Sequence, residues 1–171
     1  ITATIGIPAH NEAGNIEILL NSILTQKLSS NYRLNHIVVA CDGCTDQTAS
    51  IVRHFGKVDQ RIVVVEDDKR VGKHGRLNNF YHSVKDDVFV TFDADTRLGN
   101  NHVLEDLMKE FEDLSVALVG GNDTPDHPKT LVAKVGNVWV ASWYEMRHNL
   151  NGGDNVHNHK GCVSASRTSF V

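Results

Sequence analysis

The chain has 171 residues, of which 40% are apolar and 22% charged, and it carries a net charge of −4 at pH 7. This length suffices for one domain with a sizeable core, and the acidic balance gives no electrostatic signature of nucleic-acid binding. No run approaches the roughly 18 consecutive apolar residues of a transmembrane helix. No signal peptide or initiator Met is visible, so we expect the sequence to be part of a longer protein.

Along the chain, continuous apolar runs alternate with helical spacing. Strands are expected at residues 1–7, 36–41, 62–65, 88–92 and 116–119, and helices at 16–24, 48–55, 76–84 and 103–111. We expect the first strand to close at Pro8, because proline breaks a strand. Apolar strands alternating with amphipathic helices predict an α/β fold: a mostly parallel central sheet with helices on both faces.

Residues 131–146 carry an apolar stripe at helical spacing that includes Trp139 and Trp143. Core packing is the favoured interpretation, and contact with an acceptor or a membrane surface is the alternative. The segment that follows, residues 149–160, is rich in Asn, Gly and His and predicts a loop. A metal cluster at this end of the chain would use His148, Asp154, His157 and His159. A polar surface loop is the favoured interpretation.

The chain contains three cysteines, Cys41, Cys44 and Cys162. The first two form a C-x-x-C pair, but a zinc site needs two further ligands and no second pair exists. A redox motif would place its first cysteine at a helix N-terminus, whereas Cys41 is expected to end a buried strand. Reduced structural thiols and a cytosolic location are therefore favoured.

Polar segments follow each of the first four expected strands, and parallel sheets bind ligands beyond the carboxyl ends of their strands. The fourth strand runs into Asp93 and Asp95, whose i, i+2 spacing in an extended strand end would point both carboxylates to one face. Such oxygen ligands suit Mg²⁺ or Mn²⁺ carrying a phosphate-bearing ligand. A strand followed by a polar turn with an Asp cap is the alternative.

After the first strand, the backbone near Pro8 and Ala9 is able to offer N–H and C=O groups to a flat heterocycle. Glu12 is expected at the start of a helix, where the helix dipole stabilises a carboxylate; a ligand contact is the alternative. After the second strand, Asp42 is placed to accept from a base N–H or a ribose hydroxyl. Residues 45–46 are expected to cap the next helix.

After the third strand, residues 69–78 hold four cations within eight positions, together with two glycines. Arg and Lys make charge-assisted bonds to phosphate oxygens, and glycines let the backbone approach a ligand, which favours a diphosphate site. A solvated basic face is the alternative. Neither the G-x-x-x-x-G-K-[ST] phosphate loop nor the G-x-G-x-x-G dinucleotide motif is present.

Taken together, these segments resemble the family 2 glycosyltransferases, which have the GT-A fold. Residues 7–12 match the P-x-x-N-E opening, residues 42–48 match D-G-S-T-D-x-T with Cys44 in place of Ser, residues 72–78 match G-K-x-x-A-L-N with Arg76 where Ala is usual, and residues 93–95 match D-A-D. The resemblance covers about residues 1–121 in order. Residues 161–167 are weakly similar to a later family segment of Gly, small residues and Arg.

The resemblance implies an inverting, metal-assisted transfer of a sugar from a nucleotide-diphosphate sugar, expected to be a UDP-sugar. Its nucleotide-binding residues would be Pro8, Ala9, Glu12, Asp42, Gly72, Lys73 and Asp93, and its metal ligands Asp95 and Asp93. The Mn²⁺ or Mg²⁺ would act as a Lewis acid on the leaving diphosphate. The family also uses an acidic residue further along the chain as a general base. We assign no residue to that role, because Asp154 is the sole acidic residue after Glu145 and its surroundings do not match the family's segment.

In this scheme residues 1–121 form the donor-binding subdomain, and residues 122–171 begin an acceptor-binding part that is expected to be incomplete. The acceptor would be a polysaccharide, for example of the cell envelope, a lipid carrier or a protein, and the location the cytoplasm or the inner face of the membrane. The alternatives are a non-catalytic nucleotide-sugar binding module or inactive fragment. A sugar nucleotidyltransferase is disfavoured, because that family carries its Gly-rich basic loop directly after the first strand.

Overall fold

The computed structural model describes residues 1–121, 130–149 and 162–170 of the chain. One compact unit comprises Ile1–Gly121 together with Gly161–Val171, and a second comprises Asn122–Lys160. The last residues of the chain thus return to the unit that contains the predicted donor-binding residues.

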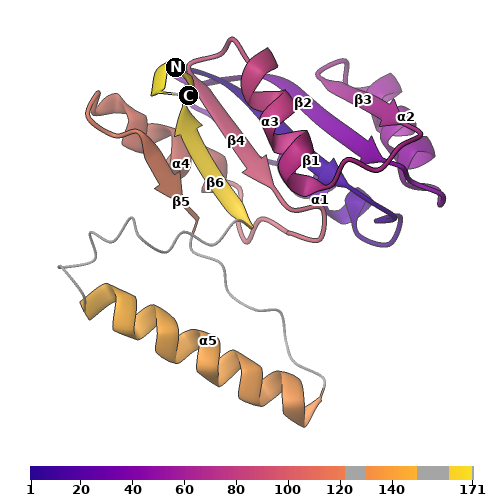
Figure 1. The fold of residues 1–171 in the computed structure, drawn as a ribbon. Helices are drawn as coiled ribbons and strands as arrows, with labels where there is room; N and C mark the ends of the chain where they lie inside the picture. Colours follow the sequence, from indigo (N-terminus) through magenta and orange to yellow (C-terminus); the bar gives the residue numbers. More distant parts are fainter. Residues whose placement is uncertain (122–129, 150–161, 171) are drawn as a thin grey trace. The chain divides into compact units, whose positions relative to one another are not determined.

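The first unit is built on a six-stranded sheet with the order β3-β2-β1-β4-β6-β5 (Figure 1). Its strands are β1 (Thr2–Ala9), β2 (Arg33–Asp42), β3 (Ile62–Asp67), β4 (Val88–Phe92), β5 (Leu118–Gly120) and β6 (Val163–Arg167). The first four pair in parallel, while β6 runs antiparallel between β4 and β5. The predicted α/β fold with a mostly parallel sheet is confirmed, with β6 as an additional strand.

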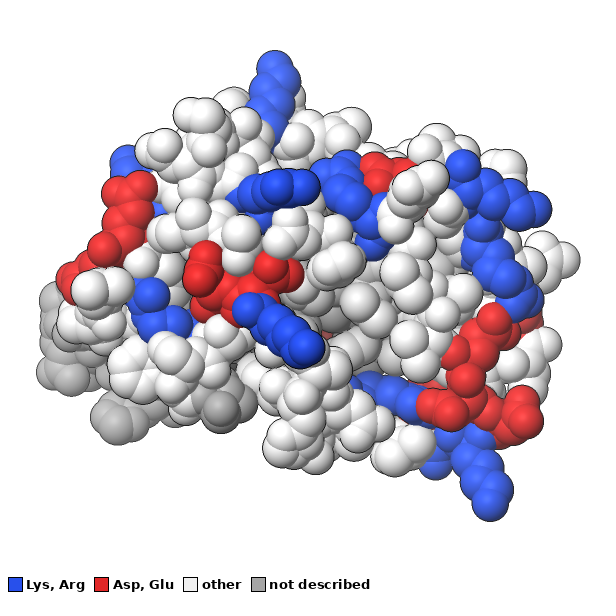
Figure 2. All heavy atoms as spheres, turned by 90° about the horizontal axis from the view of Figure 1, so that it is seen from above, with Lys and Arg blue, Asp and Glu red and all other residues white. Residues whose placement is uncertain are grey.

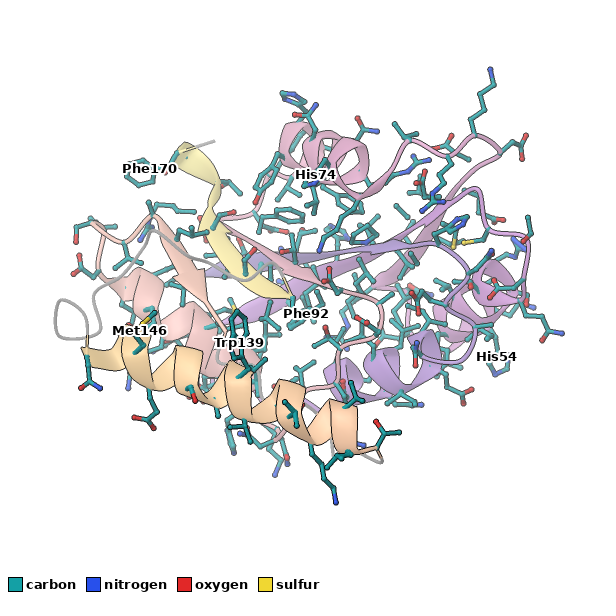
Figure 3. All side chains as sticks on the ribbon, turned by 60° about the horizontal axis from the view of Figure 1, so that its bottom comes forward. His54, His74, Phe92, Trp139, Met146 and Phe170 are labelled. Carbon is teal, nitrogen blue, oxygen red and sulfur yellow. The ribbon has the colours of Figure 1, made fainter. Side chains whose placement is uncertain are left out.

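Helices cover both faces of this sheet. On one face lie α1 (Ile16–Leu24), α2 (Thr48–Val58) and α4 (Val103–Lys109), the last followed by the 3₁₀ turn η1 (Glu110–Glu112); on the other lies α3 (Lys73–Ser83). Figure 3 shows His54 on α2 and His74 on α3, on opposite sides of the strands. The chain of the first unit ends in a second 3₁₀ turn, η4 (Thr168–Phe170).

The core follows the two-residue alternation of the strands. Ile5 and Ile7 of β1 are fully buried on the α1 side, while Gly6 between them faces α3. A Cβ atom at Gly6 would lie 2.6 Å from the ring of Phe89 and 2.9 Å from that of Phe80. The absence of a side chain at Gly6 therefore lets the α3 layer pack closely on the sheet.

Strand β1 does not close at Pro8, so that prediction was wrong: the strand continues to Ala9, and Pro8 pairs with Ala40 of β2. Pairing of β1 with β4 ends at Gly6. At Pro8 the strand is therefore bordered by β2 alone, and a residue without an N–H is tolerated where one side of a strand has no partner.

In the second unit, the described element is α5 (Leu131–Asn149). Its exposed apolar side chains are Leu131, Val132, Val135, Val138, Trp139 and Met146, two of which are labelled in Figure 3. Core packing of this stripe stays a prediction. The side chains of Trp143 and His148, and the whole of Asp154, His157 and His159, lie outside the described residues. Within the described ranges, no helix has both the length and the apolarity to cross a membrane.

Candidate functional site

The loops that follow β1 and β2 are joined by hydrogen bonds at the carboxyl edge of the sheet. The Nδ1–H of His10 donates to the carbonyl oxygen of Asp42 at 2.7 Å, and Oδ1 of Asn11 accepts from the backbone N–H of Thr45 at 2.8 Å. Asn11 has φ 56°, in the left-handed region that Asn tolerates better than most residues. His10 and Asn11 therefore fix the two loops against each other, a role that the sequence analysis did not assign to them.

Glu12, expected at the start of a helix, lies on the turn that leads into α1. Its carbonyl oxygen accepts from the N–H of Ile16, the first residue of α1, at 2.9 Å, and its carboxylate accepts from Nδ2 of Asn15 at 2.8 Å. Its own N–H donates to Oγ1 of Thr48 at 2.8 Å. The helix begins at Ile16, as its apolar spacing predicted, and residues 13–15 form a turn between Glu12 and the helix.

Asp42 at the end of β2 is 4% exposed, and its carboxylate accepts hydrogen bonds from the same chain. Its Oδ1 accepts from the N–H of Val71 and its Oδ2 from that of Gly72, each at 2.7 Å, and Nε of Arg76 donates to Oδ1 at 2.9 Å. Burial alone would raise the pKa of Asp42, but these donors outweigh it and hold the pKa below its ordinary value. The carboxylate therefore holds the loop that precedes α3.

Arg76 is the second buried ion at this position, with 3% of its surface exposed. Its guanidinium forms ion pairs with Asp42 and with Asp67 at the end of β3, and also donates to the carbonyl of Lys69 at 3.4 Å. Neither a diphosphate site nor a solvated basic face therefore describes all the cations of residues 69–78. Arg76 points into the protein, whereas Lys69 and Arg70 are exposed.

Gly72 and Lys73 connect Asp42 to the aspartate that follows β4. Gly72 has φ 85° and ψ 161°, a conformation essentially restricted to glycine. The next residue, Lys73, begins α3, and its Nζ lies 2.5 Å from Oδ1 of Asp93. Asp42, Gly72, Lys73 and Asp93 are thereby brought together from the ends of β2, β3 and β4.

The segment after β4 is a tight turn. The N–H of Asp93 donates to the carbonyl of Cys162, and the carbonyl of Asp93 accepts from the N–H of Thr96, each at 3.0 Å. The prediction that Asp93 and Asp95 share one face of an extended strand was therefore wrong, because β4 ends at Phe92. Asp93 is partly buried and Asp95 is exposed.

Two carboxylates with hard oxygen atoms fit a Mg²⁺ or Mn²⁺ ion that takes its remaining ligands from a phosphate and water. Among the residues that the structure describes, no group of three or more His, Cys, Asp and Glu side chains is arranged to hold a metal. A cation at Asp93 and Asp95 would therefore depend on oxygen atoms supplied by its ligand.

A cavity of about 270 Å³ lies at the ends of β2 and β3, lined by residues 41 and 43–45 at the end of β2 and by residues 66–68 at the end of β3.

All three cysteines are free thiols. Burial, together with the neighbouring Cys44, raises the pKa of Cys41 to about 12, so this thiol stays protonated and unreactive near neutral pH. Basic and acidic side chains are interspersed on the face of the molecule that Figure 2 shows.

The sequence model of Glycosyl transferase family 2 matches residues 4–171. The chain belongs to this family. The family expected from the motifs is confirmed, and so is the GT-A class of fold, since solved glycosyltransferase structures share it.

Among curated glycosyltransferases, glycosyltransferase AglD of Haloferax volcanii is 31% identical over 111 residues, which is 64% of this chain and 18% of AglD. The mannosyltransferase PcManGT from Pyrobaculum calidifontis, solved in complex with GDP-Man and Mn²⁺, superposes with a TM-score of 0.76 at 22% identity, covering 96% of this chain and 44% of PcManGT. Residues 1–349 of Staphylococcus aureus TarS, solved in complex with UDP-GlcNAc, give a TM-score of 0.57 at 22% identity, covering 74% of this chain and 37% of that TarS fragment. The chain thus spans less than half of each of these proteins.

Proposed function

We propose that this chain binds a nucleotide-diphosphate sugar and serves a glycosyltransferase that transfers the sugar to an acceptor hydroxyl with inversion, assisted by a divalent cation. The observation that carries the proposal is the contact of Lys73 with Asp93, beside the contact of Gly72 with Asp42. These contacts put a cation, a glycine N–H and two carboxylates at one edge of a parallel sheet, where such sheets bind their ligands.

Pro8, Ala9, Glu12, Gly72, Lys73 and Asp93 stay the nucleotide-contacting residues predicted from the resemblance. Asp42, also predicted to bind the nucleotide, would contribute by holding residues 71–72, because its carboxylate already accepts from Val71, Gly72 and Arg76. Asp93 and Asp95 would hold Mn²⁺ or Mg²⁺, and when bound the ion acts as a Lewis acid that offsets the negative charge of the leaving diphosphate. Lys73 supports this scheme from the protein side, because its ammonium group already lies beside Asp93. In the proposed complex its ammonium group would make a charge-assisted bond to a phosphate oxygen.

A UDP-sugar is the donor expected from the resemblance. TarS was solved with UDP-GlcNAc and PcManGT with GDP-Man, so both nucleotides are reasonable probes. Residues 1–121, with the returning strand β6, would make up the donor-binding part, and residues 122–160 would belong to an acceptor-binding part. The proposal names no acceptor molecule, and it assigns no residue of this chain as the general base.

The proposal is tested by calorimetric titration of UDP and of GDP into the protein, each with and without Mn²⁺. We expect one of the two nucleotides to bind, and to bind more tightly with Mn²⁺. Absence of binding by both nucleotides, with and without the metal, would contradict the proposal. Release of free nucleotide from the corresponding sugar nucleotide would then separate an enzyme from a non-catalytic binding module.

A further inference from the structure

The buried pair of Asp42 and Arg76 gives a more specific role to the end of β2. The carboxylate of Asp42 accepts from the N–H groups of Val71 and Gly72 and from the guanidinium of Arg76. A carboxylate offers about four acceptor positions, and those of Asp42 are largely taken by donors of its own chain. With 4% of its surface exposed, Asp42 has little access to a base or a ribose.

Arg76 is the unusual partner in this arrangement. The G-K-x-x-A-L-N pattern that residues 72–78 resemble has Ala at this position, and an Ala side chain could not reach a carboxylate. Here the planar guanidinium spans two strand ends, pairing with Asp42 of β2 and Asp67 of β3. Arg is suited to such a site because its donors form a rigid fork and its charge persists when it is buried.

The loop held by this pair leads directly to the predicted diphosphate site. Asp42 fixes the N–H groups of Val71 and Gly72, and Gly72 turns the chain at φ 85° into α3. The first residue of α3 is Lys73, which contacts Asp93. The position of the Lys73 ammonium therefore depends on an anchor located one residue earlier in the chain.

We propose that Arg76 is a positioning residue: with Asp42 it fixes residues 71–73, so that Lys73 faces Asp93 and the diphosphate of the donor. In this arrangement Asp42 affects diphosphate binding indirectly, by holding the loop, and does not contact the base. The effect on the ligand rests on the function proposed above, whereas the anchoring of the loop is a property of the protein alone.

The anchoring is tested first without ligand, by amide hydrogen exchange in the parent, Arg76→Ala and Arg76→Lys proteins. We expect the amides of Val71 and Gly72 to be protected in the parent and to exchange faster in both variants, with circular dichroism showing that the fold is kept. Arg61→Ala is the matched control, because Arg61 pairs with Asp59 at 2.6 Å at the opposite end of β3. Unchanged exchange at both amides in Arg76→Ala would overturn the proposal.

The consequence for the ligand is tested by titrating UDP with Mn²⁺, and uridine alone, into the same proteins. Arg76→Ala should weaken UDP binding roughly tenfold, the loss expected when a charge-assisted bond is no longer placed, and should leave uridine binding unchanged. If Arg76 acts through Lys73, the Arg76→Ala/Lys73→Ala double variant should bind UDP about as weakly as Lys73→Ala. Additive losses, or weaker uridine binding by Asp42→Asn, would overturn the proposal.

These results also separate this inference from the proposed function. A parent protein that binds neither UDP nor GDP in the presence of Mn²⁺ would refute the function, while the exchange of Val71 and Gly72 would still decide whether Arg76 anchors the loop. A parent that binds UDP, with Arg76→Ala binding it equally well, would refute the inference and leave the function standing.

Discussion

Replacing Gly72 by alanine perturbs the loop before α3 at its most constrained residue. Gly72 has φ 85° and ψ 161°, a region in which a residue with a side chain is strained by about 1–3 kcal/mol. No heavy atom lies within 4 Å of where the new Cβ would be, so the cost is entirely conformational and not a clash. An alanine also restricts the unfolded chain, which returns about 0.4–1 kcal/mol.

The net expectation for Gly72→Ala is a loss of roughly 1–2 kcal/mol of unfolding free energy. For a chain of this size that corresponds to a fall in melting temperature of about 2–8 °C. Equilibrium denaturation in urea, followed by circular dichroism, measures the free energy, and an unchanged m-value would show that the extent of unfolding is the same. If the backbone at residue 72 shifts to relieve the strain, Lys73, the next residue, should be displaced. UDP binding in the presence of Mn²⁺ should then also weaken.

Gly99→Ala is the matched control. Its Cβ would also meet no heavy atom within 4 Å, but its φ lies outside the left-handed region. We expect its unfolding free energy to stay the same or to rise by up to about 1 kcal/mol. Equal unfolding free energies for Gly72→Ala and Gly99→Ala, with equal UDP affinities, would refute the strain argument.

Three further predictions concern stability and reactivity. The pKa of Asp42 is held below its ordinary value of 3.8, so its contribution to stability is present above that value and is lost as the pH falls through the folded-state pKa. The unfolding free energy of Asp42→Asn should therefore fall less steeply than that of the parent between about pH 5 and pH 2, the range in which carboxylates titrate. Gly6→Ala should lower the unfolding free energy by about 1–3 kcal/mol through overpacking against Phe89, and a value near zero in urea denaturation would contradict the packing described. Cys41, whose pKa is raised to about 12, should resist iodoacetamide in the native protein and react after unfolding, as mass spectrometry of the labelled peptides would report; rapid native labelling would be inconsistent with its burial.

The parallel part of the fold was predictable because its signals are local. Mostly apolar runs such as Val88–Phe92 stand directly in the sequence, and β4 begins and ends where that run does. Strand β6 was not predicted, since Val163–Arg167 consists largely of small residues and gives no apolar run. It becomes a strand through its neighbours: β4 and β5 border it on either side, and the hydroxyls of Thr91 and Ser164 lie 2.7 Å apart across the pair.

The candidate site divides in the same way. Residue types and spacing were enough to predict that Asp42, Lys73 and Asp93 gather at one edge, because parallel strands end there. The burial of Arg76 could not be predicted, since a basic residue among other cations looks like part of a solvated surface. Its partners, Asp42 and Asp67, come from two different strands, so the interaction exists only after the sheet has formed.

The central claim is that the ends of distant strands form one site in which Asp93 and Asp95 hold a cation against a nucleoside diphosphate. Calorimetric titration of UDP, with and without Mn²⁺, into the parent, Asp95→Asn and Asp106→Asn proteins tests this claim most directly; Asp106 is an exposed aspartate on α4. The account predicts that Mn²⁺ tightens UDP binding by the parent and by Asp106→Asn, and that Asp95→Asn loses this dependence with its fold unchanged. Binding of UDP by Asp95→Asn that Mn²⁺ strengthens as much as in the parent would contradict it.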